Sequence, residues 1–355
     1  MIYKYSEAVL NDKIVTGDLV KLACQRFQND LDRDDVYFDE EKAAQVINFI
    51  EKGCKHWKGV MAGKPMKLED HQKFFFGNIY GWRRKENNLR RFRTVYKQVA
   101  RKNGKTTESA LSSNFHILKD GPQGAQVWVG ANKEDQAKIL VTDAANILQE
   151  SDEFRKLIEQ KKIKILRYAE SAKKIVYFPK KSFIAPLGRD SKTQDGFDPS
   201  KGTIDEYHEA KDDSLLNIIE SGMGARLEPL LEVITTAGYN KAGPCYSKLR
   251  KTGVDVLKGI IEDDFYFPLI YELDEQDDWK DIEMWIKANP NLNISVYLDY
   301  LKTRFIKAKN EGGSKEVDFK TKNLNMWTDS AEVFIRDEFW VANHDARFNQ
   351  KDLEG

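Results

Sequence analysis

Hydrophobic residues near the start of the chain recur at helical spacing. From Glu41 to Ile50 the apolar side chains fall close to one face of a helix, and Asp39 stands where a capping residue would be. Gly and Pro interrupt this pattern between Lys55 and Lys67, and it resumes from Leu68 to Trp82 with three consecutive phenylalanines. Residues 1–65 are therefore predicted to form an N-terminal helical extension in front of a core.

Strand-like and helical patterns alternate from residue 94 onward. A strand at 94–99 precedes a helix at 106–118, and a strand at 126–130 precedes a helix at 133–149. This alternation predicts βαβ units and a mainly parallel central sheet flanked by helices. Two further core strands are predicted at 202–205 and 231–236.

The remaining patterns are less regular. Short strands at 163–166, 175–178 and 182–187 follow one another too closely to have helices between them, so an antiparallel insertion is predicted. Beyond residue 243 a strand-like stretch at 265–273 mixes with helical ones, which indicates a small lid subdomain. The predicted domains are the extension at 1–65, the core at 66–242, and the lid with a linker at 243–355.

Composition narrows the class of protein. The mean hydropathy of -0.62 and the lack of an apolar run of about 20 residues argue against a membrane protein. The N-terminus does not resemble a signal peptide, so a cytoplasmic location is expected. Three cysteines without CxxC spacing and five scattered histidines do not favour a zinc site.

Charge is balanced over the whole chain. Lys and Arg together number 57, as do Asp and Glu, so any contact with nucleic acid must be local. The densest basic stretch lies between residues 83 and 93. Two interpretations stay open for it, a DNA contact and a solvated surface loop. Its basic members are Arg83, Arg84, Lys85, Arg90, Arg91 and Arg93.

The segment from Val99 to Thr107 has the features of a phosphate-binding loop. It joins a predicted strand to a predicted helix, which favours this interpretation over an accidental polar turn. Backbone amides of the loop would surround phosphate oxygens, Lys105 would reach the β and γ phosphates, and Thr106 would ligate Mg²⁺. Val99 replaces the first glycine of the strict pattern, so the match is to the GKT triplet and its context. The predicted nucleotide-binding residues of this loop are Arg101, Lys102, Asn103, Gly104, Lys105, Thr106 and Thr107.

Two carboxylates end the predicted strand at 202–205. Asp205 would hold Mg²⁺ and Glu206 would orient and polarise the attacking water. Asp205 to His208 also spells DExH, which raises a nucleic-acid helicase or remodelling ATPase as an alternative, although no second RecA-like domain with its arginine-rich motif follows. Thr235 and Thr236, at the end of the next core strand, are placed to contact the γ phosphate.

Taken in order, these segments resemble the large terminase subunits of tailed double-stranded DNA phages, from about Leu68 to the end of the chain. The fold that follows is a P-loop NTPase of the RecA/ASCE-like type. The resemblance implies that Gln72 binds adenine, that Arg101 senses or stabilises the γ phosphate, and that Thr235 and Thr236 belong to a coupling motif. The departure at Val99 is expected of this family.

The resemblance also carries expectations about function. The chain is expected to be a Mg²⁺-dependent ATPase that translocates double-stranded viral DNA into a procapsid, with ATP and Mg²⁺ as cofactors. Its expected partners are the portal protein, the small terminase subunit and further copies in a ring, with a monomer as the isolated form. It would act in the host cytoplasm, docked transiently on the procapsid, and would be absent from the mature virion. A nucleotide-dependent scaffold that does not hydrolyse ATP is the non-enzymatic alternative.

Two expectations concern what lies outside the core site. No carboxylate cluster with the spacing of a two-metal nuclease is visible, and the chain end looks like a linker before a nuclease domain, so nuclease activity is not expected. An arginine from a neighbouring subunit is expected to raise the rate, and Arg189 and Arg226 are the candidates.

Overall fold

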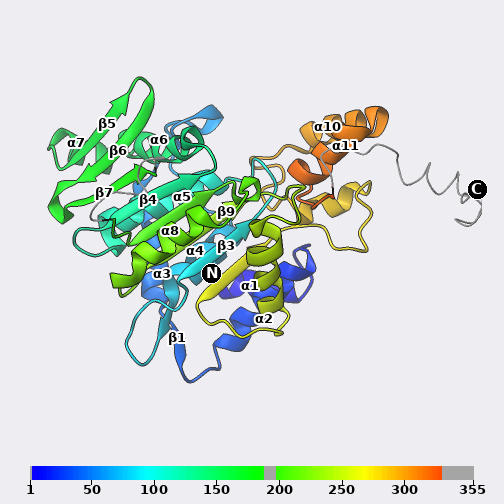
Figure 1. Cartoon of the computed structure of the whole chain (residues 1–355), viewed down its shortest axis with the longest axis horizontal. Coiled ribbons are helices and arrows are strands. Elements are labelled where there is room, and N and C mark those ends of the chain that lie inside the picture. The colour runs from blue at the N-terminus through cyan, green and yellow to red at the C-terminus, as the bar shows by residue number, and fades with distance from the viewer. Residues whose placement is uncertain (1, 188–196, 330–355) are drawn as a thin grey trace, which may run out of the picture.

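A large central sheet organises the computed structural model, which describes residues 2–187 and 197–329. The sheet has eight strands in the order β10-β3-β9-β8-β4-β7-β6-β5 (Figure 1). These strands are β3 (Thr94–Gln98), β4 (Gln126–Ala131), β5 (Ile163–Tyr168), β6 (Ser171–Tyr177), β7 (Ser182–Pro186), β8 (Lys201–Asp205), β9 (Leu230–Thr235) and β10 (Tyr266–Ile270). A separate two-stranded ribbon pairs β1 (Val36–Phe38) with β2 (Trp82–Arg84).

The strands from β10 to β7 run parallel, which confirms the predicted fold class. β9 lies between β3 and β8, with Thr235 beside Gln98 and Ile234 beside Asp205. The carboxyl ends of these three strands therefore meet at one edge of the sheet. The segment predicted as an antiparallel insertion extends this same sheet instead, because β7 pairs in parallel with β4 while β6 and β5 are antiparallel.

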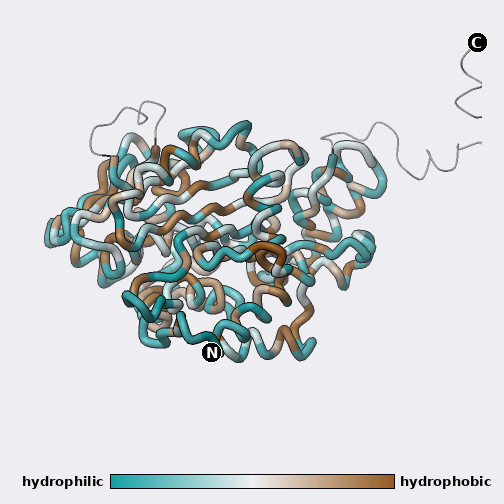
Figure 2. The backbone as a smooth tube through the Cα atoms, turned by 60° about the horizontal axis from the view of Figure 1, so that its bottom comes forward, coloured by the Kyte–Doolittle hydropathy of each residue, from teal (hydrophilic) through white to brown (hydrophobic). Residues whose placement is uncertain are grey.

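Helices cover both faces of the sheet. On one face α5 (Lys105–Phe115) packs on β9 and α6 (Glu134–Glu150) packs on β4, β6 and β7. On the other face α8 (Ser214–Gly222) packs on β4 and β8. The hydropathy colouring in Figure 2 places brown, hydrophobic backbone through the interior and teal backbone mostly outside. The remaining helices are α1 (Ile2–Leu10), α2 (Asp18–Asp30), α3 (Glu40–Gly53), α4 (Asp70–Gly81), α7 (Asp152–Glu159), α9 (Lys251–Leu257), α10 (Leu298–Glu311) and α11 (Gly313–Asp318).

Local capping accounts for two of the helix starts. The Asp39 side chain accepts a hydrogen bond from the amide of Lys42 and caps α3, as predicted. Helix α4 begins with a capping box, in which the Glu69 side chain accepts from the amide of Gln72 and the Gln72 side chain accepts from the amide of Glu69. The N-terminal helices share one hydrophobic core with the sheet.

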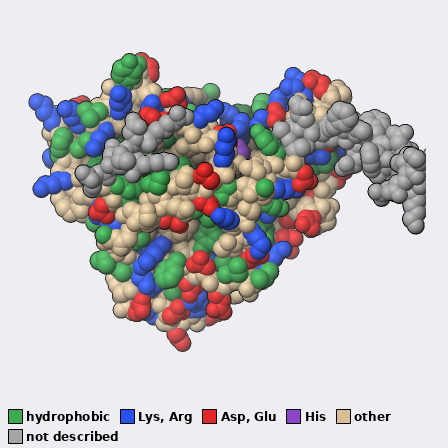
Figure 3. Space-filling model, viewed as in Figure 1, with side chains coloured by type: hydrophobic (Ala, Val, Ile, Leu, Met, Phe, Trp, Pro, Cys, Tyr) green, Lys and Arg blue, Asp and Glu red, His purple; other side chains and the backbone are tan. Residues whose placement is uncertain are grey.

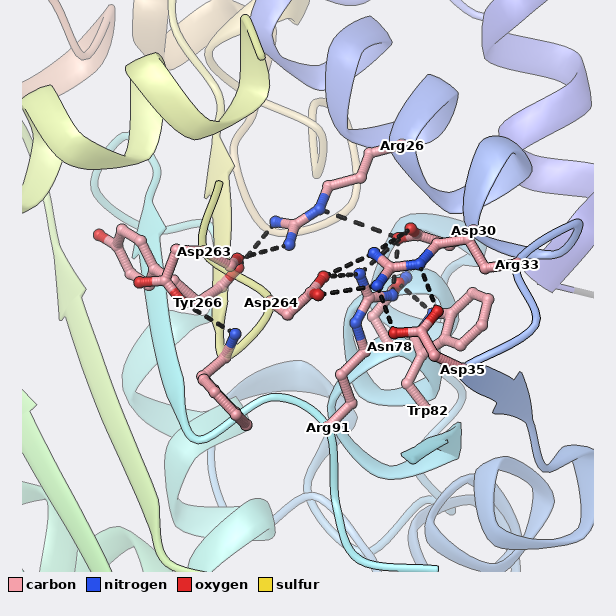
Figure 4. Close-up of polar contacts among 11 residues, drawn as sticks. Arg26, Asp30, Arg33, Asp35, Asn78, Trp82, Arg91, Asp263, Asp264 and Tyr266 are labelled. Atoms are coloured by element: carbon pink, nitrogen blue, oxygen red, sulfur yellow. Dashed lines mark hydrogen bonds and ion pairs between the residues drawn. The ribbon is translucent and has the colours of Figure 1, made fainter. Parts of the chain in front are cut away.

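A cluster of arginines and aspartates fastens α2 to the core (Figure 4). Arg91 is fully buried and pairs with Asp30 of α2 at 2.7 Å and with Asp264, just before β10, at 2.8 Å. Arg33 pairs with Asp264 at 2.6 Å, and Arg26 donates to backbone carbonyls of the same loop. The contacts of Arg26 and Arg33 join segments more than 200 residues apart along the chain. The N-terminal helical extension therefore packs with the central sheet as one body.

Three of the six basic residues at 83–93 fit neither of the two interpretations, whereas Lys85 is exposed. Arg83, Arg90 and Arg91 are buried, with exposed fractions of 4%, 2% and 0%. Arg83 pairs with Glu228 and Arg90 pairs with Asp120. These guanidinium groups are committed to internal ion pairs and are not free to contact DNA.

A second, smaller hydrophobic cluster forms beyond β10. It is built around Trp285 and Phe319, both fully buried, with Phe305 packed between them. Figure 1 places α10 and α11 of this part at one end of the molecule, away from β5 and β6. Since β10 belongs to the main sheet although it was assigned to the lid region, we propose that the boundary between core and lid falls after Ile270. None of the helices in the described ranges combines the length and apolar character that crossing a bilayer requires.

Candidate nucleotide-binding site

The predicted phosphate loop connects β3 to α5. Lys102 and Gly104 have positive φ angles of 71° and 86°, and Gly104 is the N-cap of α5 in the left-handed region that glycine adopts without strain. Lys105, Thr106 and Thr107 form the first turn of the helix, so their amides have no carbonyl one turn earlier to bond. A helix start with free amides is suited to holding an anion.

The side chains at the start of α5 already contact the acidic strand end. The Lys105 Nζ lies 2.7 Å from a carboxylate oxygen of Glu206, and the Thr106 hydroxyl donates to the Asp205 carboxylate at 3.2 Å. These pairs are formed across 101 and 99 residues of sequence. The strand order brings them together, because β9 is the only strand between β3 and β8. Lysine, hydroxyl and two carboxylates therefore form one group.

Glu206 has an unusual backbone conformation. Its φ of 53° and ψ of 44° lie in the left-handed region, which is strained for a residue other than glycine. Its amide donates to the Asp205 carboxylate at 2.8 Å. The sharp turn after β8 gives the two adjacent carboxylates different neighbours: Asp205 accepts from Thr106, while Glu206 accepts from Lys105.

The end of β9 and the turn after β8 surround Glu206 from the other side. His208 Nδ1 is 3.2 Å from a Glu206 carboxylate oxygen and 3.1 Å from the Thr235 hydroxyl. The His208 amide donates to the same hydroxyl at 2.9 Å, and the Thr236 hydroxyl donates to Glu206 at 3.5 Å. His208 thus links the carboxylate of Glu206 to the end of β9.

The two carboxyl groups differ in pKa. Burial raises the pKa of Asp205 to about 6, with the charge of Lys105 opposing the rise. Burial would also raise the pKa of Glu206, but the His208 hydrogen bond and the Lys105 charge outweigh it and hold that pKa well below its usual range. Glu206 is therefore ionised, whereas Asp205 would gain from a nearby cation.

The donor atoms at this point suit Mg²⁺. The Thr106 hydroxyl and the Asp205 carboxylate are hard oxygen ligands, and they lie within 3.2 Å of one another. Within residues 2–187 and 197–329, no group of three or more His, Cys, Asp or Glu residues is arranged to hold a metal ion. Mg²⁺ commonly binds one or two protein oxygens together with substrate phosphates, so this pair is sufficient.

Helix α4 borders the loop through Gln72. The Gln72 Nε2 donates to Glu108 of α5 at 2.9 Å and lies 3.9 Å from the Cβ position that Gly104 lacks. Glu108 also forms a buried ion pair with Lys97 of β3. Gln72 is thus next to the loop, with its amide nitrogen engaged by Glu108.

Thr107 faces away from the carboxylates. Its hydroxyl donates to Asp143 of α6 at 3.0 Å, and Asp143 also accepts from Trp57 and from Lys58. The sequence analysis missed Asp143 as a partner of the loop, since it stands within an ordinary helical pattern.

The outer side of the phosphate loop contacts the described residues after β10, 271–329, which we call the C-terminal subdomain. The amides of Ala100 and Arg101 donate to the carbonyls of Ala288 and Lys322 at 3.4 and 2.9 Å. Asn103 turns its side chain in the same direction. Its Nδ2 donates to Asn289 at 2.9 Å, and its Oδ1 accepts from the Asn291 amide at 3.1 Å.

Further asparagines extend this contact. Asn291 Nδ2 donates to the Asn103 carbonyl at 2.9 Å, and Asn291 Oδ1 is 2.8 Å from His71 Nε2. Asn325 accepts from the amide of Ala237, just beyond β9, at 2.7 Å. We call Asn103, Asn289, Asn291 and Asn325 the asparagine clamp. No local pattern in the sequence identifies it.

The predicted site residues thus fall into two groups. Lys105, Thr106, Asp205, Glu206, Thr235 and Thr236 come together, with Gly104 and Gln72 at the margin. Asn103 and Thr107 direct their side chains to other partners, as described above. The Nε of Arg101 is buried without a hydrogen-bond partner among the described residues.

Of the two arginines expected as trans-acting candidates, the structure describes Arg226. Arg226 donates to the carbonyl of Asp198 and pairs with its carboxylate at 2.9 Å. It precedes β9, so it lies at the opposite edge of the sheet from the phosphate loop. Arg189 lies outside the described residues.

Comparison with known proteins identifies two domain families along the chain. A family model described as terminase large subunit, ATPase domain, matches residues 70–252. A second, described as terminase large subunit, endonuclease domain, matches residues 260–355.

Individual relatives agree with these matches. Protein YmfN of Escherichia coli (strain K12) is 41% identical over 161 residues, which are 45% of this chain and 35% of that protein. The terminase large subunit of Enterobacteria phage HK97 is 27% identical over 302 residues, which are 84% of this chain and 56% of that protein. The crystal structure of the HK97 bacteriophage large terminase aligns with a TM-score of 0.67 at 26% identity, over 81% of this chain and 55% of that one. The chain spans about half the length of these relatives or less.

The expectation that this chain has no nuclease activity is wrong, because the endonuclease-domain model matches residues 260–355. The expectation relied on the spacing of carboxylates along the sequence. Metal-binding carboxylates of a nuclease come from separate elements that the fold brings together, so their spacing in the sequence need not be visible. Part of the matched region, 330–355, lies outside the described residues.

Proposed function

The chain belongs to the terminase large subunit family, and from this premise we propose that it is a Mg²⁺-dependent ATPase that drives viral DNA packaging. The observation that carries the ATPase is the contact of Lys105 and Thr106 with Glu206 and Asp205 across β9. A cation, a hydroxyl and two carboxylates at a helix start are the groups that ATP hydrolysis requires.

Each group has a role in the proposed reaction. The amides from Lys102 to Thr107 would hold phosphate oxygens, and Lys105 would leave Glu206 to bind the β and γ phosphates. Thr106 and Asp205 would hold Mg²⁺, which neutralises charge on the phosphates. Glu206, freed from Lys105, would orient the attacking water and accept its proton.

Residues around this centre have supporting roles. Gln72 is proposed to bind adenine after exchanging its bond to Glu108, and Arg101 to contact the γ phosphate. Thr235 and Thr236 are proposed to respond to loss of the γ phosphate, because both lie within hydrogen-bonding distance of the His208–Glu206 group.

The test is ATP hydrolysis by the purified chain with and without Mg²⁺. Glu206→Gln should bind ATP and lose turnover, because the amide keeps the shape and loses the base. Lys105→Ala should lose tight ATP binding, since its ammonium is the main mobile charge on the phosphates. Glu262→Gln is the matched control, because Glu262 is an exposed glutamate that takes no part in the contacts of the site. Turnover by Glu206→Gln within twofold of the unaltered chain would assign the base to another residue.

The proposed setting follows from the family. We propose that copies of the chain form a ring on the procapsid portal, receive DNA with the small terminase subunit, and act in the host cytoplasm without entering the mature virion. Hydrolysis should rise when double-stranded DNA, portal and neighbouring copies are present.

The endonuclease-domain match adds DNA cleavage as a second candidate activity. Incubation of the chain with supercoiled plasmid and Mn²⁺ tests it, with a chelator as the control. Cleavage that persists in Glu206→Gln and disappears with the chelator would separate this activity from ATP hydrolysis.

A further inference from the structure

The end of the sheet farthest from the phosphate loop is strongly basic. We define the basic hairpin as residues 160–181, which comprise β5, β6 and the segments beside them. It has eight basic residues and one acidic residue, a net charge of +7 in a chain whose total is zero. Figure 3 shows Lys and Arg side chains projecting from this end of the molecule.

Five of these eight basic side chains are directed to solvent, while Arg167 and Lys180 donate hydrogen bonds within the chain. Lys161, Lys162, Lys164, Lys173 and Lys181 are exposed. None of the eight basic side chains forms an ion pair with another described residue, in contrast to the buried arginines at 83–93. A group of unpaired cations of one sign is an electrostatic site for a polyanion.

The hairpin also offers an open surface. β5 is the edge strand of the sheet, and α8 packs mainly on β4 and β8 on its face. On that face Lys174 lies over the ring of Phe183 at 3.9 Å, so it shares the face with β7 side chains. Among the described residues no helix covers this face of β5 and β6.

From this charge and exposure we infer that the basic hairpin binds the phosphate backbone of double-stranded DNA. The inference rests on the proposed function, which supplies the polymer. Lysines that contact phosphates bind without regard to sequence, as a protein that moves along DNA requires. The site does not compete with ATP, because six strand spacings separate β5 from β3, about 29 Å at about 4.8 Å each.

A single helix connects the hairpin to the nucleotide site. The Thr142 hydroxyl of α6 accepts from the Ala172 amide of the hairpin at 3.0 Å, and the adjacent Asp143 accepts from Thr107 at the start of α5. Further along α6, Arg167 of the hairpin donates to Asn146 and to Gln149, both at 2.6 Å. A displacement of α5 on ATP binding or hydrolysis would therefore reach the proposed DNA contact through α6.

The test compares charge-neutralised variants. In the hairpin variant Lys161, Lys162, Lys164 and Lys173 are changed to Gln, and in the control variant the exposed Lys4, Lys13, Lys52 and Lys258 are changed to Gln. A third variant replaces the four hairpin lysines with Arg. Binding of fluorescein-labelled double-stranded DNA of arbitrary sequence is measured by anisotropy from about 50 to about 200 mM KCl.

The hairpin variant should bind DNA at least tenfold more weakly at the lowest salt. The slope of log K against log salt should become shallower by about 0.9 for each phosphate contact removed, up to about 3.6 for four. The control variant should keep the original slope, and the arginine variant should restore it.

Three results would overturn the inference: no DNA binding by the unaltered chain, an unchanged slope in the hairpin variant, or an equal loss in the control variant. An unchanged slope with new aggregation would show that the lysines only protect an edge strand. ATP hydrolysis without DNA, measured in the same samples, should be equal in all four proteins. If the unaltered chain does not hydrolyse ATP, the proposed ATPase activity is refuted. The DNA-binding measurements would still test the basic hairpin independently.

Discussion

Removal of the Asn103 side chain should weaken the contact between the C-terminal subdomain and the phosphate loop and lower the stability of the chain. Asn103→Ala deletes a long hydrogen bond to the Arg101 carbonyl at 3.4 Å and three shorter ones, to the Ala100 carbonyl at 3.0 Å, to Asn289 at 2.9 Å and from the Asn291 amide at 3.1 Å. At about 1 kcal/mol for each of the shorter bonds, the loss in free energy of unfolding is about 3 kcal/mol. For a chain of 355 residues that corresponds to a fall in Tm of about 4 °C.

A double-mutant cycle separates this role from direct contact with nucleotide. Asn103→Ala and Asn289→Ala remove opposite ends of one bond, so their effects on stability should be coupled by about 1 kcal/mol. Asn114→Ala is the matched control, because Asn114 is also a buried asparagine but bonds to Ala144 of α6. It should be additive with Asn289→Ala.

Thermal and urea unfolding of the singles and doubles, with and without ATP, provide the measurement. ATP should stabilise Asn103→Ala less than the unaltered chain, because the loop is held less firmly before it binds. Additivity of Asn103→Ala and Asn289→Ala within about 0.4 kcal/mol would refute the clamp as the reason why Asn103 matters.

Three further predictions concern other contacts. Arg91→Met should lower the free energy of unfolding by about 3 kcal/mol in urea titrations, because it leaves the buried Asp30 carboxylate with only the longer contacts to Arg33 and Arg26; a loss below 1 kcal/mol would contradict this. Burial lowers the pKa of His71 to about 4, so between pH 6.5 and pH 4 His71 is protonated in the unfolded chain and neutral in the folded chain. Stability should therefore fall by about 3 kcal/mol as pH drops through this window, and His71→Gln should flatten that part of the pH profile. His208→Ala should lower kcat about tenfold with little change in KM, since it removes the bond that positions Glu206, and His208→Asn should restore part of the rate; equal changes in kcat and KM would indicate a general loss of structure.

The centre of the site could be predicted because each half is a short segment with its own chemistry. Lys105 and Thr106 at a strand-to-helix junction, and Asp205 and Glu206 at a strand end, are local patterns. That the strands carrying them lie on either side of β9 is seen only in the strand order of the structure. The left-handed backbone of Glu206 and its bond to His208 do not follow from these patterns, because they depend on the turn after β8.

Interactions between distant segments could not be predicted. Asn103 and Asn289 are separated by 186 residues, and neither belongs to a recognisable motif. The same limit explains the arginines, since Arg91 looks like a surface charge until Asp30, 61 residues earlier, is placed beside it. The density of charge along the sequence indicated 83–93, where Arg83, Arg90 and Arg91 form internal ion pairs, while the larger exposed basic surface lies at 160–181.

The division of the phosphate loop between two partners gives it two separate sets of exchangeable protons. The amides of Ala100 and Arg101 donate to carbonyls of the C-terminal subdomain. In the proposed function, the amides from Lys102 to Thr107 hold phosphate oxygens. Hydrogen–deuterium exchange at the first pair would therefore follow opening of the subdomain, while exchange at the second set would follow occupancy by nucleotide. Exchange at consecutive amides of one loop would therefore measure nucleotide binding and opening of the C-terminal subdomain separately.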